Sequence, residues 1–260
     1  NYQYRQEPTT LKVDYQFYTV SSEAWDAMLE AIKNAQKSIY WECYIISDNT
    51  TTHNFFDALK QKAKEGLRVK IIADALGSFW LSREAVTELT VAGAEVLFFN
   101  HLLPWWNLRR FRHWWLSRNH KKILIVDEKI GFVGGVNVDQ KFYHWLDLHV
   151  RVRGLVVRAL LYSFVKSYRF CGGKDFSFSK SKPRILKLKL RFFDHWPFQK
   201  NSFLKKYYLS HLTNAQKKII IATPYFAPRW WLLKSIINAS QRGVRIEIIL
   251  PNVSDNLLAD

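Results

Sequence analysis

Two short sequence patterns occur twice in this chain, and this repeat is the strongest constraint on its fold. Asn34-Ala-Gln-Lys37 returns as Asn214-Ala-Gln-Lys217, and EGLRVKII at residues 65–72 returns as RGVRIEII at residues 242–249. A period of roughly 180 residues is too long for a stack of short repeats. The chain is therefore predicted to hold one domain and the start of a duplicate.

The boundary between the two copies is predicted from composition. Residues 171–184 are rich in Gly, Ser and Lys and have no strand or helix pattern, which is typical of a linker. We place the first domain at residues 1–170 and the truncated second copy at residues 185–260.

Apolar runs alternate with helical patterns along the first copy. Strands are predicted at residues 38–46, 67–73 and 94–99, and helices at residues 52–65 and 82–92. This order predicts an α/β fold with a mostly parallel central sheet that is flanked by helices.

The segment from residue 119 to residue 137 combines two apolar strands with an unusual set of polar residues. Residues 122–126 predict a buried strand, on which His120 and Lys122 share a face. Asp127 has the opposite parity and is expected to support the site from behind. The spacing H-x-K-x4-D-x6-G-G-x-N falls on His120, Lys122, Asp127, Gly134, Gly135 and Asn137.

These residue types suit the transfer of a phosphodiester. A neutral imidazole at His120 is a nucleophile, while Lys122 and Asn137 can neutralise the phosphate oxygens in the transition state. Gly134 and Gly135 would let the backbone approach a bound group.

Asp147 is the candidate for orienting the His120 ring. It lies in the strand predicted at residues 145–154. A carboxylate that accepts the second ring proton of a nucleophilic histidine fixes the tautomer and stabilises the cation that forms. The alternative is a surface or salt-bridged aspartate.

Residues 101–122 interrupt the alternation with six Lys or Arg and no acidic residue. Indole rings favour the headgroup level of a bilayer and guanidinium groups pair with phosphates, so this segment is predicted to meet anionic lipid. The alternatives are stacking on the bases of a nucleic-acid strand or inward packing of the rings. The predicted lipid-facing residues are Trp105, Trp106, Arg109, Arg110, Arg112, Trp114 and Trp115.

Composition limits the partners and the chemistry. Lys and Arg number 39 against 22 acidic residues, and the net charge of +17 favours a polyanionic partner. Cys43 and Cys171 cannot build a disulfide framework, and no cluster has the spacing of metal ligands, so we expect a reducing compartment and no metal. No apolar run approaches the roughly 18 residues of a membrane span. The chain begins at Asn1 without a Met, which leaves open a preceding N-terminal membrane anchor.

The signature resembles the HKD motif of the phospholipase D superfamily, and the likeness covers nearly the whole chain. It implies a phospholipase D-like α/β domain. Single-chain members pair two such motifs in one site, so a second motif is expected beyond Asp260. Softer motifs are similar to the bacterial cardiolipin synthase branch: Trp41-Glu-Cys-Tyr44, Gly-Gly-Val-Asn at 134–137, Trp-x-Asp-x-His at 145–149, Thr223-Pro-Tyr-Phe226 and Pro251-Asn-Val-Ser-Asp255.

The resemblance implies a phosphatidyltransferase that needs no cofactor. His120 would attack phosphatidylglycerol, form a phosphohistidine and release glycerol, and the hydroxyl of a second phosphatidylglycerol or another alcohol would complete the transfer. The histidine of the second motif would act as general acid and base. The 260 residues alone are therefore expected to be poorly active, unless two chains join as a homodimer.

Two other functions fit the same residues. The signature also suits a hydrolase of phospholipid or a nuclease, whereas a non-catalytic basic module would tolerate a broken signature, and this one is intact. The aromatic and cationic segment favours anionic phospholipid and a membrane surface over nucleic acid. The expected location is peripheral, on the cytoplasmic side of a bacterial cell membrane.

Overall fold

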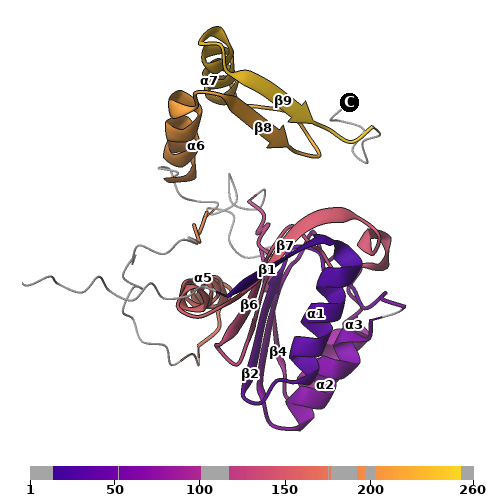
Figure 1. Cartoon of the computed structure of the whole chain (residues 1–260). Coiled ribbons are helices and arrows are strands. Elements are labelled where there is room, and N and C mark those ends of the chain that lie inside the picture. Colours follow the sequence, from indigo (N-terminus) through magenta and orange to yellow (C-terminus); the bar gives the residue numbers. More distant parts are fainter. Residues whose placement is uncertain are drawn as a thin grey trace, which may run out of the picture. The chain divides into compact units, whose positions relative to one another are not determined.

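The structure is a computed structural model that describes residues 14–51, 53–100, 117–174, 176, 192–196 and 203–252. It divides into two compact units, residues 1–197 and residues 198–260 (Figure 1). The strands of the first unit are β1 (Tyr15–Val20), β2 (Ser38–Cys43), β3 (Arg68–Asp74), β4 (Glu95–Phe99), β5 (Ile123–Val126), β6 (Ile130–Gly134) and β7 (Leu146–Arg153). Its helices are α1 (Ser21–Lys33), α2 (Phe55–Lys64), α3 (Arg83–Val91), the short 3-10 helix η2 (Gln140–Phe142) and α5 (Val156–Phe170).

The seven strands form one mixed sheet in the order β1-β7-β6-β5-β2-β3-β4. The pairs β2–β3 and β3–β4 are parallel, whereas β1–β7, β7–β6, β6–β5 and β5–β2 are antiparallel. The α/β class is confirmed, but the expectation of a mostly parallel sheet is wrong. The short turn between β5 and β6 explains one of these antiparallel pairs, because a parallel crossover needs about a dozen residues.

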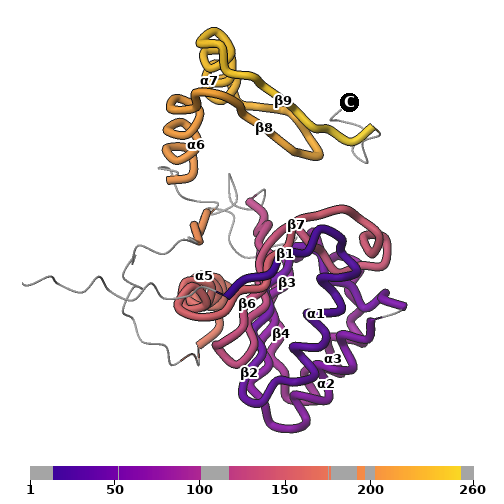
Figure 2. Tube along the Cα trace, viewed as in Figure 1, coloured from indigo at the N-terminus to yellow at the C-terminus, as the bar shows by residue number. Residues whose placement is uncertain are grey.

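Helices cover both faces of this sheet (Figure 1). Helices α1, α2 and α3 lie on one face and α5 lies on the other, as the tube in Figure 2 also shows. Strand β2 packs on both sides: Ile39 and Trp41 join the core beneath α1, while the Tyr40 ring stacks on Phe164 of α5 at 5.4 Å. Burial on two faces explains why β2 is apolar at every position except Ser38 and Glu42.

The first unit extends further along the chain than the sequence predicts. Asp194 forms an ion pair with Lys121 at 2.8 Å, and the Trp196 ring packs edge-on against Phe170 of α5. These contacts place residues 192–196 in the first unit. The boundary therefore lies after Trp196, not at residue 185.

The second unit repeats the strand–helix–strand pattern of the first. Its strands β8 and β9 pair in parallel with Lys218 opposite Arg245, as β2 and β3 pair with Ser38 opposite Arg68. The repeated sequence thus forms the same local structure in both units. The elements are α6 (Phe203–Asn214), β8 (Lys218–Ala222), α7 (Trp230–Gln241) and β9 (Arg245–Ile249).

Candidate active site

His120 and Lys122 lie where the chain enters β5. The Lys122 Nζ atom lies 3.3 Å from His120 Nδ1 and donates a hydrogen bond to the His120 carbonyl oxygen at 3.0 Å. Tyr44, just after β2, packs its ring against the imidazole with 4.4 Å between centroids. The prediction that His120 and Lys122 share a face is confirmed.

The surroundings give the two side chains different protonation states. Desolvation, and then repulsion by the Lys122 ammonium, lowers the pKa of His120 to about 4. Desolvation also lowers the pKa of Lys122 to about 8, against the opposing effect of Cys43 and Asp147. Near neutral pH the imidazole therefore has an unprotonated nitrogen, while most Lys122 side chains keep their charge.

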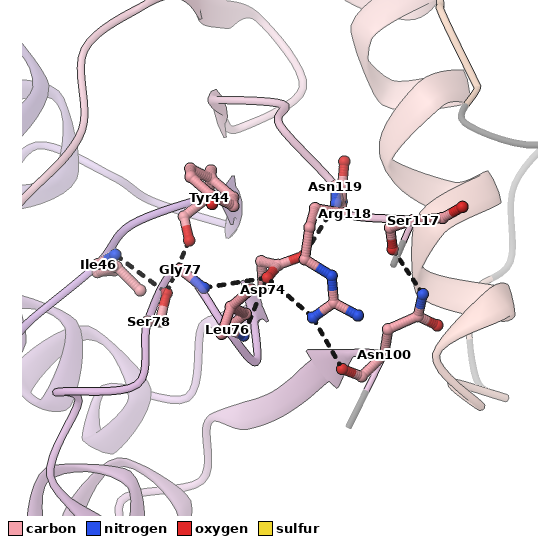
Figure 3. A network of polar contacts seen from close by, with 10 residues as sticks. All are labelled: Tyr44, Ile46, Asp74, Leu76, Gly77, Ser78, Asn100, Ser117, Arg118 and Asn119. Atoms are coloured by element: carbon pink, nitrogen blue, oxygen red, sulfur yellow. Dashed lines mark hydrogen bonds and ion pairs between the residues drawn. The ribbon is translucent and has the colours of Figure 1, made fainter. Parts of the chain in front are cut away.

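Two buried carboxylates that our sequence analysis did not identify hold this segment in place. Asp74, the last residue of β3, accepts a hydrogen bond from the Asn119 backbone N–H at 2.8 Å and a longer one from the Arg118 guanidinium at 3.4 Å (Figure 3). Glu42 of β2 accepts a hydrogen bond from the Asn119 side chain at 2.5 Å, and burial raises its pKa. A charged residue inside an otherwise apolar strand was the available sequence signal for Glu42.

A cavity of about 370 Å³ opens beside the histidine. His120, Lys122 and Phe193 are among the residues that line it. Lys121 forms its ion pair with Asp194 at 2.8 Å, and this pair fastens residues 192–196 beside the motif. The cavity thus combines a nucleophile, a cation and aromatic surface. No sequence pattern indicated that residues 192–196 would contribute.

Asn137 follows β6 and is held by α1 and by the segment after β2. Its Oδ1 atom accepts a hydrogen bond from the Ile45 backbone N–H at 3.3 Å, and its carbonyl oxygen accepts one from the Trp25 indole at 3.0 Å. Since the side-chain oxygen is engaged by the protein, the amide N–H groups are the part of Asn137 that suits a bound anion.

Asp147 lies close enough to Lys122 for its charge to oppose in part the desolvation that lowers the pKa of Lys122. Its Oδ1 atom accepts a hydrogen bond from the Leu148 backbone N–H at 2.7 Å. Within the described residues no hydrogen bond joins Asp147 to His120. The role of Asp147 in orienting His120 therefore stays a prediction.

Gly134 and Gly135 have a packing explanation that differs from the one drawn from sequence. A Cβ atom at Gly135 would lie 2.0 Å from Asp147 Oδ1, and one at Gly134 would lie 2.7 Å from His149 Nδ1. The two glycines thus allow close approach to β7. Contact with a bound phosphate remains a prediction.

Asp127 lies at the opposite end of β5 from His120. Its carboxylate accepts hydrogen bonds at 2.7 to 3.1 Å from the backbone N–H groups of Gln36, Lys37 and Ser38. The structure therefore does not bring Asp127 and His120 together. Asp127 instead fixes the end of the β5–β6 hairpin to the start of β2, so a role for it at the active site stays a prediction.

The aromatic and cationic segment can be placed only in part. Residues 101–116, which include all seven predicted lipid-facing side chains, lie outside the described residues. Their flanks are joined, because the Asn100 side chain donates a hydrogen bond to the Ser117 carbonyl oxygen at 2.7 Å (Figure 3). Among the described helices, none is both long and apolar enough to span a membrane.

A helix-flanked mixed sheet that presents a His-x-Lys pair is the architecture expected of phospholipase D-like proteins. Residues 28–151 and 208–259 match the family model described as "Cardiolipin synthase, PLD-like domain". The chain therefore belongs to this family.

Individual relatives agree with this assignment. The chain is similar to cardiolipin synthase 2 of Bacillus anthracis, with 33% identity across 91% of this chain and 48% of the relative, and to the cardiolipin synthase of Alkalihalophilus pseudofirmus, with 31% identity across 95% and 51%. The chain spans about half the length of the curated relatives it matches.

Solved structures support the fold. Phosphatidylserine synthase of Haemophilus influenzae matches with a TM-score of 0.66 and 15% identity, over 92% of this chain and 61% of that chain. Polyphosphate kinase of Porphyromonas gingivalis matches with a TM-score of 0.56 and 12% identity, over 93% and 36% of the respective chains.

Proposed function

We propose that this chain contributes the nucleophilic half of a phosphatidyltransferase of the cardiolipin synthase type. The observation that carries the proposal is the neutral imidazole of His120 held 3.3 Å from the buried ammonium of Lys122 at the edge of a cavity. A lone pair beside a fixed positive charge is the arrangement that attack on a phosphodiester needs.

In the proposed first step, the unprotonated nitrogen of His120 forms a bond to phosphorus as the bond from phosphorus to the glycerol oxygen breaks. The leaving oxygen takes a proton from a general acid, for which we propose the histidine of a second motif. Lys122 and the Asn137 amide stabilise the phosphate oxygens. In the second step the histidine of the second motif, now unprotonated, takes the proton of an acceptor hydroxyl, whose oxygen bonds to phosphorus as the bond from phosphorus to His120 breaks.

We propose phosphatidylglycerol at an anionic membrane surface as the donor. Cardiolipin synthase relatives and the net charge of +17 both support an anionic phospholipid. Peripheral association with the membrane follows from this substrate. Asp147 is proposed to orient His120 once a phosphate occupies the cavity.

The test uses a phosphatidyl ester of p-nitrophenol, because that leaving group needs little help from a general acid. The chain should release a burst of about one nitrophenol per active site, and His120→Asn should abolish it. The burst rate should rise as pH increases through about 4, where His120 loses its proton, and fall above about 8, where Lys122 does.

Three controls separate the alternatives. His144→Asn replaces an exposed histidine outside the cavity and should keep the burst. A nitrophenyl ester of a single-stranded oligonucleotide tests the nuclease alternative, and a larger burst from it would contradict the lipid assignment. An undiminished lipid burst in His120→Asn would overturn the proposal.

A further inference from the structure

The loop between β3 and α3 exposes three large apolar side chains. Leu76 is 50% exposed, Phe79 61% and Trp80 74%. The rings of Phe79 and Trp80 meet edge-on with 5.3 Å between centroids. Adjacent exposed apolar groups of this size indicate an interaction surface.

The backbone beneath these side chains is firmly held. Asp74 accepts hydrogen bonds from the N–H groups of Leu76 and Gly77, and the Ser78 hydroxyl donates one to the Tyr44 carbonyl oxygen (Figure 3). A Cβ atom at Gly77 would lie 2.2 Å from that same carbonyl oxygen. The loop backbone is thus held against Tyr44.

The residues that hold this loop also support the candidate active site. Asp74, which holds the loop, also accepts the hydrogen bonds from Arg118 and Asn119 that precede His120 (Figure 3). Tyr44, to which the loop is tied, packs against the His120 ring at 4.4 Å. The loop that carries the exposed apolar side chains therefore shares its supporting residues with the candidate active site.

Polar groups adjoin Trp80. Trp80 borders an open groove of about 630 Å³ whose lining includes Asn49, Gln140 and Lys141. An indole beside amides and an ammonium suits the headgroup level of an anionic bilayer, where one side of the ring is apolar and the other is wet. A second copy of this chain is a less suitable partner for these apolar side chains, because two chains of net charge +17 repel each other.

We propose that Leu76, Phe79 and Trp80 insert into the headgroup region of an anionic lipid bilayer and hold the opening of the active site against it. This inference rests on the proposed function in one respect, namely that the substrate is a lipid. The surface itself rests on the exposure and the fixed geometry of the loop.

The first test measures binding without turnover. Co-sedimentation with vesicles of phosphatidylglycerol and phosphatidylcholine compares the chain with the double variant Phe79→Ser, Trp80→Ser. Losing two inserted rings should weaken binding by at least about tenfold. The matched control is Tyr15→Ser, Phe17→Ser, which removes another exposed edge-on pair, 5.5 Å apart on β1, and should bind like the unmodified chain.

The second test locates the contact. Vesicles that carry a photoactivatable headgroup-level probe should label residues 76–80 of the unmodified chain. Unchanged vesicle binding in the Phe79, Trp80 variant would overturn the proposal, as would labelling that avoids residues 76–80. A change in oligomeric state in place of lipid binding would reassign the surface to a second copy. Because no reaction is needed, loop-dependent binding can hold even if the nitrophenol burst fails.

Discussion

The segments β2–α2–β3 and β8–α7–β9 share a sequence pattern and a local structure but differ in burial. Every residue of β2 is buried, whereas β8 exposes alternate side chains, and Ile220 is 56% exposed. The difference arises because β2 has β5 on its second edge and α5 across one face. The repeated pattern thus determines the local unit, and neighbouring elements determine how deeply it is buried.

The two copies also differ at the positions that hold the active site. In the register of the repeat, Glu42 corresponds to Ala222 and Asp74 corresponds to Pro251. Glu42 and Asp74 are the buried carboxylates that fasten Asn119. The scaffold is therefore shared, and the groups that position the chemistry belong to the first copy.

The largest effect is expected from Asp74→Ala. This change would leave several donors without an acceptor, including the N–H groups of Leu76, Gly77 and Asn119. It should lower the free energy of unfolding of the first unit by up to about 5 kcal/mol. The matched change Pro251→Ala in the second unit should cost less than about 0.5 kcal/mol. Hydrogen exchange at β3 and β9 measures each unit separately, and equal costs would contradict the contrast between the copies.

The second-largest loss of stability is expected from substitutions in the hydrophobic core. Trp41→Ala removes a fully buried ring from β2 and should cost about 4 kcal/mol, while Ile221→Ala in the half-buried β8 should cost about 1 kcal/mol. Denaturant titration followed by exchange at each strand compares the two. A cost at Ile221 that matched the cost at Trp41 would show that β8 is buried as deeply as β2.

Acid should destabilise the first unit through His149. Burial lowers its pKa to about 3, and neither ring nitrogen has a hydrogen-bond partner in the described part of the chain. The unfolded chain binds the proton near pH 6.5 and the folded chain does not. The free energy of unfolding should therefore fall by up to about 1.4 kcal/mol for each pH unit as the pH drops from 6.5 towards 3. His149→Phe should flatten this slope, whereas His211→Phe, on the exposed surface of α6, should not. An unchanged slope in His149→Phe would locate the effect elsewhere.

The smallest effect should be the same in both copies. Gly66 and Gly243 follow α2 and α7 with φ angles of 86° and 85°, and a Cβ atom would meet no atom within 4 Å at either. Each Gly→Ala change should therefore cost about 1 kcal/mol from backbone strain alone. Thermal unfolding with exchange readout would test this, and unequal costs would mean that the local units are not equivalent.

Local patterns in the sequence were sufficient for the individual elements. The strand predicted at residues 67–73 agrees with β3, and the closeness of His120 and Lys122 followed from strand parity. The pairing of β5 with β2 and of β1 with β7 could not be predicted, because these partners are far apart in sequence.

Part of the candidate site could not be predicted from the sequence, for a similar reason. The sequence shows that Asp147 follows the motif, but sequence spacing does not tell which donor its carboxylate accepts from. In the structure that donor is the Leu148 N–H. Asp74 and Asp194 act through contacts with residues more than 40 positions away, which no local pattern records.

If His120 is the nucleophile, the most direct measurement is to locate the covalent intermediate on its ring. The chain is mixed with the phosphatidyl nitrophenyl ester, quenched under conditions that preserve phosphohistidine, digested and sequenced by mass spectrometry. We expect a phosphatidyl group on His120, absent from His120→Asn and strongly reduced in Lys122→Met. A stoichiometric burst with no adduct on His120, or with the adduct on another residue, would contradict it.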